Sequence, residues 1–339
     1  MSQEKENKSE LVDMLGVARV AQGVDESSEV ERFGVKVVAP AKVNLFLEIG
    51  ARRADGYHDA LSIMHALSLH DVLYMAVRPP REEAEAGRGL VIDLACRAQG
   101  GVPDLELPVE DNTVARAARL LAQACGRERD EVLTVHLRKY IPVQAGLGGG
   151  SADAAAALVG CANLWGLAPD DPRIEQAARQ VGADVPFFLH GGCVCLAGAG
   201  DVFDHALKPR ADYVVLVRPE AGVSTAQAYR AFDEAPTSID ATDSALAAAA
   251  ARAAEVPLRN NLAPASERLL PQLAEVRAWL AERLGADAVL LAGSGSTTFA
   301  VAPSFPEASR IASEARTHGW WARATTFSPI RAAIVPQDD

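Results

Sequence analysis

Apolar residues recur along this chain with two periods, which predict its strands and helices. Continuous or alternating apolar runs are typical of strands, whereas apolar residues three or four positions apart are typical of helices. The two kinds of element alternate without the regularity of a doubly wound sheet, so the predicted fold class is α+β. Strands are predicted at 35–50, 66–77, 90–98, 132–143, 212–219, 288–302 (with a glycine turn inside it) and 321–329. Helices are predicted at 111–126, 151–158, 171–182, 224–232, 244–254, 267–285 and 306–319.

Prolines, glycines and polar residues mark where these elements break or end. Pro40 interrupts the first strand pattern, so we expect either two strands or one strand with a break. Asp111 is the expected N-cap of the first predicted helix, and Gly126 is its expected end. Composition changes near Gly198, which suggests a domain boundary there. We expect a mobile N-terminal tail at 1–32, one domain at 33–197 and a second domain at 198–335.

The acidic composition narrows the classes of partner. The chain has 339 residues and a formal net charge of −12. This charge disfavours sequence-independent binding to nucleic acid or to an anionic membrane. No apolar run is long enough to span a bilayer, and the first thirty residues lack the charged-then-apolar order of a secretory signal. A cytoplasmic protein is therefore expected.

The cysteines give no sign of a disulfide framework or of a metal site. They are five in number and scattered, whereas disulfide frameworks use paired, regularly placed cysteines. The sequence "CVC" at 193–195 has the wrong spacing for a structural zinc pair. No HExxH motif is present. We therefore predict no metal site built by the protein alone, and we assign the cysteines structural roles.

The stretch "PVQAGLGGGSADAAAAL", at 142–158, joins a glycine loop to an alanine-rich helix. Glycine lets a backbone approach a ligand closely, and a helix start carries free amide hydrogens and partial positive charge. Together they form an anion site suited to phosphate, with Ser151 as the expected helix cap. The loop matches neither the P-loop nor the dinucleotide fingerprint. A flexible linker or tight turn is the alternative, but the strand before it and the helix after it favour a phosphate cradle.

Three motifs in order resemble the GHMP kinase superfamily. They are "APAKVNLFLEIGARRADGYHD", the glycine loop and "LAGSGSTTFAV". The first motif, with "PAKVNLFL" followed by "DGYH", resembles the 4-diphosphocytidyl-2-C-methyl-D-erythritol kinases within that superfamily. The resemblance runs from about Val37 to the final strand. It implies a ribosomal-protein-like α/β domain at the N-terminus, a ferredoxin-like domain at the C-terminus, and an active site between them.

The resemblance also implies an ATP-dependent phosphoryl transfer to the 2-hydroxyl of a cytidyl diphosphate sugar alcohol, with ATP and Mg²⁺ as cofactors. It gives the catalytic roles to Lys42 and Asp184. The implied ATP-binding residues are Pro142, Val143, Gln144, Ala145, Gly146, Leu147, Gly148, Gly149, Gly150, Ser151 and Ala152. The implied substrate-binding residues are Asn44, Tyr57, His58, Tyr229, Gly293, Ser294 and Gly295.

The roles given to Lys42, Asp184 and His58 each have a simpler structural alternative. Lys42 could be a surface lysine at a strand edge, and His58 could be an ordinary turn residue after "DG". Asp184 could cap a helix that starts at Pro186. Asp153 competes with Asp184 for the role of base, but it lies in the first turn of the alanine helix. There it would repel phosphate unless turned away, so we interpret it as a helix-start residue.

The sequence departs from the family pattern at two places. Gln144 occupies a position that is usually small and could narrow the loop entrance, and "NNLAPA" at 260–265 stands where an acidic "NDLE" is common. The function alternatives are another GHMP kinase, such as a homoserine kinase, and a non-catalytic nucleotide-binding protein. "DGYH" argues against the first alternative, and the presence of both Lys42 and Asp184 argues against the second.

Overall fold

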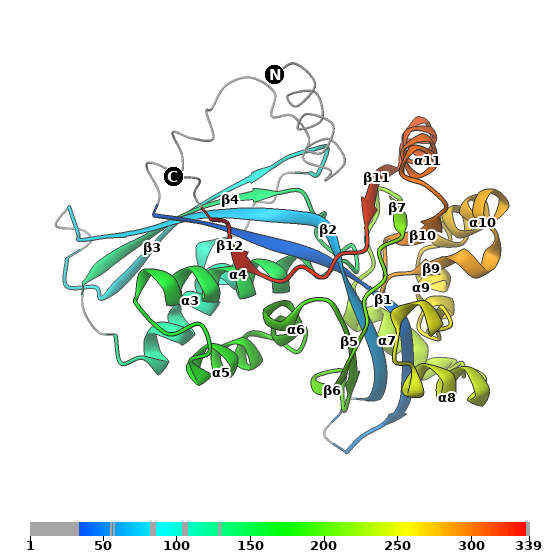
Figure 1. The fold of residues 1–339 in the computed structure, drawn as a ribbon, viewed down its shortest axis with the longest axis horizontal. Coiled ribbons are helices and arrows are strands. Elements are labelled where there is room, and N and C mark those ends of the chain that lie inside the picture. Colours follow the sequence, from blue (N-terminus) through cyan, green and yellow to red (C-terminus); the bar gives the residue numbers. More distant parts are fainter. Residues whose placement is uncertain are drawn as a thin grey trace.

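The structure is a computed structural model that shows two sheets side by side, with helices packed against each (Figure 1). This mixture of helices and mainly antiparallel strands confirms the predicted α+β class. The predicted N-terminal tail and Tyr57 lie outside the residues that the structure describes. Those residues are 34–54, 56, 58–81, 86–103, 108–127 and 130–336.

Two long antiparallel strands, β1 (Val35–Arg52) and β2 (His58–Arg78), run through the larger sheet. Their register shifts between Pro40 and Lys42, so the predicted break is an irregularity inside one strand rather than a gap between two. On one side of the shift, β2 pairs with β4 (Glu131–Lys139). On the other side, β2 pairs with β5 (Cys193–Ala197). The shift therefore divides the sheet into two parts that share β1 and β2.

The remaining strands of this sheet pair at its edges. β3 (Leu90–Ala98) runs parallel to β4, and β6 (Val202–Leu207) pairs with β5. Two short strands, β8 (Arg259–Asn260) and β12 (Ala333–Ile334), pair with β1. Because β5 and β6 form a hairpin of the larger sheet, the boundary expected at Gly198 falls inside that hairpin.

Helices α3 (Thr113–Ala124), α4 (Gly149–Leu164), α5 (Pro172–Val181) and α6 (Val185–His190) pack together on one face of this sheet (Figure 1). The helix α4 is buried on nearly all sides, as its run of alanines allows, because small side chains let neighbouring elements approach closely. Its core contacts include Val37 and Met75 of the long strands. The sheet and α4 thus hold the glycine loop in a fixed position.

The smaller sheet contains β7 (Tyr213–Arg218), β9 (Val289–Leu291), β10 (Thr298–Ala302) and β11 (Trp321–Thr326), in the order β11-β7-β10-β9. All its pairs are antiparallel. With α10 (Gln272–Leu284) before β9 and α11 (Phe305–Thr317) before β11, the succession is β-α-β-β-α-β. This succession is the ferredoxin-like arrangement that the resemblance implied.

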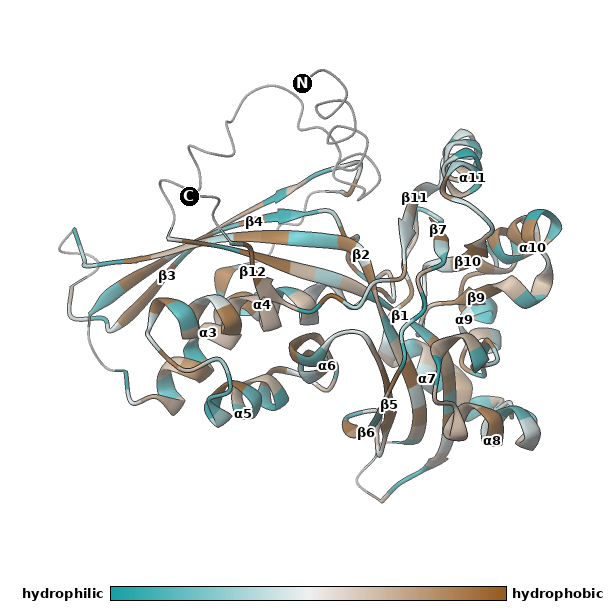
Figure 2. Ribbon diagram, in the orientation of Figure 1, coloured by the Kyte–Doolittle hydropathy of each residue, from teal (hydrophilic) through white to brown (hydrophobic). Residues whose placement is uncertain are grey.

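Both faces of the smaller sheet are buried, which explains the unbroken apolar run of β7. Val215 and Val217 face α10 and α11, while Val214 and Leu216 join a core that includes Val43 of β1. Successive residues of a strand point to opposite faces, so neither face can be polar. In Figure 2 hydrophobic colour follows β9 and β10, whereas α11 at the outer edge is largely hydrophilic. The shared core joins the two sheets.

The structure corrects the bounds of two predicted helices. The 111–126 helix begins after Asn112, whose side chain accepts the amide of Val114, and not after Asp111. The helix predicted at 267–285 is two helices, α9 (Ala263–Leu269) and α10, because Pro271 separates them. The other helices of the second half are α7 (Thr225–Glu234) and α8 (Ala241–Ala249), and short 3₁₀ turns occupy Val109–Asp111, Ala253–Glu255 and Ala286–Ala288.

Two further expectations concern cysteines and membranes. All five cysteines carry free thiols, as expected for a chain without a disulfide framework. Among the described residues, no helix combines the length and the apolar character needed to cross a membrane.

Candidate active site

A cavity of about 460 Å³ lies where the two sheets meet. Its wall combines Lys42 and Asn44 of β1 with the start of α4 and with Asp184, which precedes α6. The smaller sheet adds Gly293 and Ser294, and α7 adds Tyr229. The structure therefore brings together residues from three separate motifs. The predicted ATP-binding residues at its wall are Pro142, Val143, Gln144, Ala145, Gly146, Gly148, Gly149, Gly150 and Ser151.

Leu147, Ala152 and Gly295 were predicted site residues, but they do not line the cavity. Leu147 and Ala152 have side chains packed in the hydrophobic core, because each points away from the loop's open face. Leu147 contributes through its backbone instead, since its carbonyl accepts the amide hydrogen of Lys42 at 2.9 Å. Gly295 belongs to the turn between β9 and β10, where its amide donates to the carbonyl of Ala292 at 2.9 Å and its Cα faces Leu291 and Leu273. These positions hold the loop and the turn in shape.

The glycine loop ends in a helix start that opens into the cavity. The N-cap of α4 is Gly148 and not Ser151, which lies in the first turn. Gly148 has a φ of 71°, in the left-handed region, and a Cβ there would lie 2.6 Å from the ring of Phe188. Only glycine meets both conditions. The first amides of α4 have no carbonyl partner within the helix, so this end carries the donors and partial positive charge that phosphate requires.

The turn at 293–297 braces the glycine loop from the other sheet. The amide of Ser296 donates to the carbonyl of Gln144 at 3.3 Å, and the amide of Thr297 donates to the carbonyl of Ala145 at 3.0 Å. A Cβ on Gly146 would lie 2.0 Å from the carbonyl oxygen of Ala292, so the two segments touch. Gln144, with a φ of 51°, remains at the cavity wall. The cavity thus depends on contact between the two sheets.

Lys42 and Asp184 meet inside the cavity. The Lys42 side chain is almost completely buried, and its Nζ lies 3.6 Å from Asp184 Oδ2. The same Nζ donates to Asn44 Oδ1 at 2.9 Å, and Asn44 Nδ2 donates to Ser62 Oγ at 2.9 Å. Lys42 is therefore held by neighbours on β1 and β2 and is not a surface lysine at a strand edge. Its charge is directed at the space in front of the helix start.

Asp184 occupies the N-cap position of α6 without acting as a cap. Its backbone is helical, with φ −80° and ψ −14°, and its side chain makes no capping hydrogen bond. The carboxylate is instead about one-third exposed and faces Lys42 in the cavity. A carboxylate beside a lysine in a cavity can accept a proton from a bound hydroxyl.

Asp153 has a different environment, and its interpretation as a helix-start residue is wrong. It is buried, and its Oδ2 accepts from Lys139 Nζ at 2.6 Å, while the same Nζ also contacts Asp71. Burial raises the pKa of Asp153, and Lys139 opposes this effect. Burial alone would lower the pKa of Lys139, but the two aspartates raise it overall. The three residues form a buried ion cluster under the start of α4.

His58 and Tyr229 lie together next to the cavity. His58 is buried and its Nε2 contacts Asp233 Oδ1 at 2.7 Å. Its ring centroid lies 5.5 Å from that of Tyr229, which lines the cavity, whereas His58 itself does not. Burial and the charge of Asp184 raise the pKa of Tyr229 to about 12, so its hydroxyl stays protonated. Tyr57 is outside the described residues.

Sequence reasoning missed the side chains that support this site. Asn260 Nδ2 donates to the carbonyls of Leu291 and Gly293, at 2.9 and 2.7 Å, and Asn261 bonds both backbone groups of Ile49. The departure "NNLAPA" therefore supplies buried amides that hold the turn and β1 in place. Two consecutive asparagines before an apolar helix could have indicated such a role, because buried amides need several partners.

Comparison with known proteins gives the family. Residues 112–192 match the family described as GHMP kinases N terminal domain, and residues 239–319 match GHMP kinases C terminal. A 4-diphosphocytidyl-2-C-methyl-D-erythritol kinase from Salinispora tropica is 38% identical over 290 residues, covering 83% of this chain and 87% of that protein. A kinase of the same name from Pelotomaculum thermopropionicum is 37% identical over 286 residues, covering 83% and 94%.

Solved structures agree with these relatives. A crystal structure of 4-(cytidine 5'-diphospho)-2C-methyl-D-erythritol kinase matches with a TM-score of 0.65 at 33% identity, covering 86% of this chain and 99% of that one. A homoserine kinase structure from Cytophaga hutchinsonii matches with a TM-score of 0.63 at 19% identity, covering 89% and 97%. The second match shows a shared fold alone. The chain therefore belongs to the 4-diphosphocytidyl-2-C-methyl-D-erythritol kinases, a family of the GHMP kinases.

Proposed function

We propose that this chain transfers the γ-phosphoryl group of ATP to the 2-hydroxyl of 4-diphosphocytidyl-2-C-methyl-D-erythritol, a step of isoprenoid precursor synthesis. The 2-hydroxyl oxygen forms a bond to the γ-phosphorus, the bond to the β-phosphate oxygen breaks, and ADP leaves. The observation that carries the proposal is the approach of Lys42 Nζ to within 3.6 Å of Asp184 in front of the helix start of α4. Phosphoryl transfer requires this combination of charge, base and positioning.

Each group has a separate task in this proposal. The first amides of α4 and the glycine loop hold the phosphates of ATP. Asp184 accepts the proton that the 2-hydroxyl loses. Lys42 balances the negative charge that develops on the transferred group. Asn44 keeps the Lys42 amine directed at the cavity through its 2.9 Å hydrogen bond. The clustering of these groups at one cavity wall supports the assignment.

Mg²⁺ fits the same cavity as a partner of the nucleotide. Protein sites for this ion typically use one or two side-chain oxygens, with phosphate oxygens and water completing the shell. The hydroxyl of Ser151 lies at the cavity wall in the first turn of α4 and would supply such an oxygen. The ion would neutralise phosphate charge.

The free thiols and the acidic composition also support a cytoplasmic location.

The cytosine base is assigned to the end of the cavity near Tyr229. A flat base favours stacking on an aromatic ring, and Tyr229 supplies that ring. His58 lies behind it with Nε2 engaged by Asp233, which fixes the orientation of the imidazole. In this proposal Nδ1 is the ring atom of His58 that meets the polar edge of the base. In this proposal His58, with Tyr57 and Tyr229, forms the part of the site that identifies the substrate.

A substrate panel tests the function. The purified protein is assayed for ADP production with the cytidyl substrate, homoserine and mevalonate, each at matched concentration with ATP and Mg²⁺. We expect turnover with the cytidyl substrate alone. Turnover with homoserine would show that the fold is used for a different acceptor, and ATP binding without turnover on any acceptor would support a non-catalytic nucleotide-binding protein.

A further inference from the structure

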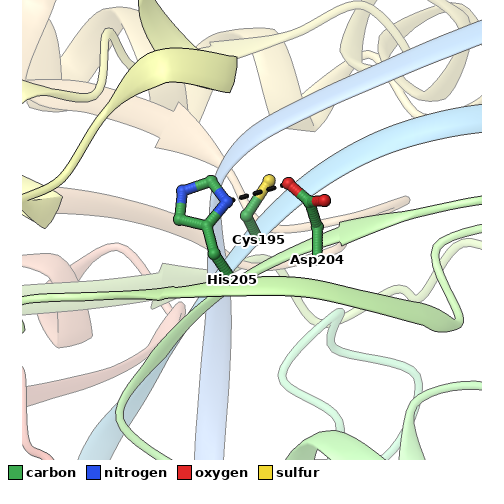
Figure 3. A group of neighbouring side chains, drawn as sticks. All are labelled: Cys195, Asp204 and His205. Atoms are coloured by element: carbon green, nitrogen blue, oxygen red, sulfur yellow. Dashed lines mark hydrogen bonds and ion pairs between the residues drawn. The ribbon is translucent and has the colours of Figure 1, made fainter.

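Three side chains outside the kinase cavity meet on the hairpin formed by β5 and β6. Cys195 lies on β5, and Asp204 and His205 lie on β6 (Figure 3). The Cys195 sulfur, an Asp204 carboxylate oxygen and a His205 ring nitrogen all lie within 4.8 Å of one another. Cys195 is buried, whereas the side chains of Asp204 and His205 are 60% and 35% exposed. The cluster is thus anchored in the core and open to solvent on one side.

A β-bulge places Asp204 in this group. Cys195 pairs with His205 and Leu196 pairs with Phe203, so Asp204 is an extra residue on β6. Consecutive residues of a regular strand face opposite sides of the sheet, and Asp204 and His205 could not then converge. Bulges re-aim side chains, often at functional sites. The irregularity of the hairpin therefore gathers three different ligand types at one point.

The hydrogen bonds of His205 leave one ring nitrogen facing a carboxylate. Nε2 lies 3.1 Å from the carbonyl oxygen of Ala250, which can only accept, so Nε2 carries a hydrogen. Nδ1 lies 2.8 Å from Asp204 Oδ2. A neutral imidazole has a single N–H, so Nδ1 of the neutral ring presents its lone pair toward the Asp204 carboxylate. With the Cys195 sulfur beside them, these atoms form a set of donors suited to a cation.

We propose that Cys195, Asp204 and His205 bind one divalent transition-metal ion, with Zn²⁺ as the preferred ion. Thiolate, imidazole and carboxylate are the three donor types of protein zinc sites, whereas Mg²⁺ and Ca²⁺ prefer oxygen ligands alone. Zinc-binding histidines commonly donate their other N–H to a backbone carbonyl, as His205 does to Ala250. Binding replaces the Cys195 thiol proton by a metal–sulfur bond and releases that proton to solvent. The fourth position of the tetrahedron is open to water on the exposed side.

The site is placed where an ion would cross-link the hairpin. The turn between β5 and β6 contributes Ala199 and Gly200 to the wall of the kinase cavity. An ion held by Cys195 on one strand and His205 on the other would join the two strands below this turn. Its first effect is therefore a more stable hairpin. No sequence motif indicates the site, because Cys195 meets Asp204 and His205 only through strand pairing and a bulge.

Cobalt(II) reports the site directly, because a thiolate ligand gives a sulfur-to-metal charge-transfer absorption. The full-length, nucleotide-free protein is titrated with Co²⁺ and then with Zn²⁺. We expect one equivalent of Co²⁺ to produce the band and Zn²⁺ to displace it. Cys195→Ser should abolish the band, and His205→Ala should weaken Zn²⁺ binding at least roughly 10-fold, since even residues that only orient ligands are worth that much.

Two control variants separate this site from adventitious binding. Cys193→Ser removes a buried thiol two residues away on the same strand, and His190→Ala removes a half-exposed imidazole elsewhere. Both should keep the band and the Zn²⁺ affinity. His205 is part exposed, so its variant is expected to fold, and circular dichroism checks this. A wild-type protein that gives no charge-transfer band, or a band that survives Cys195→Ser, would overturn the proposal.

Discussion

Asp153 and Asp184 are both carboxylates at the wall of one cavity, and their neighbours give them different properties. Asp184 is partly exposed and faces Lys42 across 3.6 Å. Asp153 is buried, and Lys139 already occupies one of its oxygens. Replacing Asp153 would leave Lys139 paired with Asp71 and would remove one charge-assisted hydrogen bond from the buried cluster. A partly exposed carboxylate next to a lysine is instead available to a substrate.

The variant His58→Ala tests whether His58 recognises the cytosine base. Removing a hydrogen-bonding group from a buried polar site leaves its partner unpaired. The variant should therefore lose on the order of 1–3 kcal/mol of binding to the cytidyl substrate, roughly a 5- to 150-fold rise in KM. The KM for ATP should change little. Acceptor analogues without cytosine should be poor substrates for the wild-type protein and for the variant. Steady-state kinetics with both acceptors decides the matter, and equal losses for both would mean that His58 supports the fold only.

The sequence indicated which residues gather at the site better than it indicated the spatial neighbours of each residue. Lys42, Asp184 and Ser151 could be placed at one site because their motifs resemble a known family. The cluster of Asp153 with Lys139 and Asp71 could not be predicted. Those partners lie on strands of the sheet, up to 82 positions away in the chain. Nothing local in "GGGSADAAAAL" distinguishes a helix-start aspartate from one that points into the core.

At the scale of elements, the start of α4 can be probed at one glycine without disturbing its packing. A Cβ on Gly150 would lie 3.6 Å from Thr113 Oγ1, an ordinary contact, whereas a Cβ on Gly149 would lie 3.0 Å from Ile141 and 3.2 Å from Lys139 Nζ. Gly150→Val should therefore weaken ATP binding strongly with a small change in Tm. Gly149→Val should lower both. Calorimetric titration with ATP and thermal melts measure the two effects.

An unaltered ATP affinity in Gly150→Val would contradict the phosphate cradle. The glycines would then serve only the left-handed turn at Gly148. Gly150→Ala provides the graded control, because a methyl group at that point of the cavity wall should weaken ATP binding less than the branched side chain does.

The strand β2 carries a histidine that should make the fold sensitive to acid. His65 is fully buried; its Nδ1 donates to the carbonyl of Ala66, and its Nε2 accepts the amide hydrogen of Arg210. Burial lowers the pKa of His65 from 6.5 to about 4. The unfolded chain therefore binds a proton below pH 6.5 that the folded chain refuses until about pH 4. Stability should fall by ~3 kcal/mol across that window.

Denaturant unfolding at several pH values measures this effect. His65→Gln should lower stability at neutral pH but flatten its decline between pH 6.5 and 4. Part of the decline should remain, because burial also lowers the pKa of His70. His190→Gln, at a half-exposed position, is the control and should leave the slope unchanged. An unchanged slope in His65→Gln would mean that His65 has the same pKa in the folded and the unfolded chain.

At the scale of the whole molecule, two contacts create the site. The turn at 293–297 holds the glycine loop through backbone hydrogen bonds, and the core containing Val43 and Leu216 joins the two sheets. The sequence predicted most of the strands and helices in their order, since apolar periodicity reports burial directly. It placed a domain boundary at Gly198, inside the β5–β6 hairpin, and it did not predict the short strand β12, because strand pairing over long separations leaves little local signal.

The central claim is that Lys42, Asp184 and the start of α4 form one phosphoryl-transfer centre. The most direct test is kcat with the cytidyl substrate for Asp184→Asn and Asp153→Asn, measured with ATP affinity on the same preparations. Positioned proton transfer is typically worth roughly 100- to 10,000-fold, so Asp184→Asn should lose that much kcat while binding ATP normally. Asp153→Asn should lower Tm and retain most of its turnover per folded molecule. The account would be contradicted if Asp184→Asn kept a kcat close to that of the wild type while Asp153→Asn lost most of its kcat without a fall in Tm.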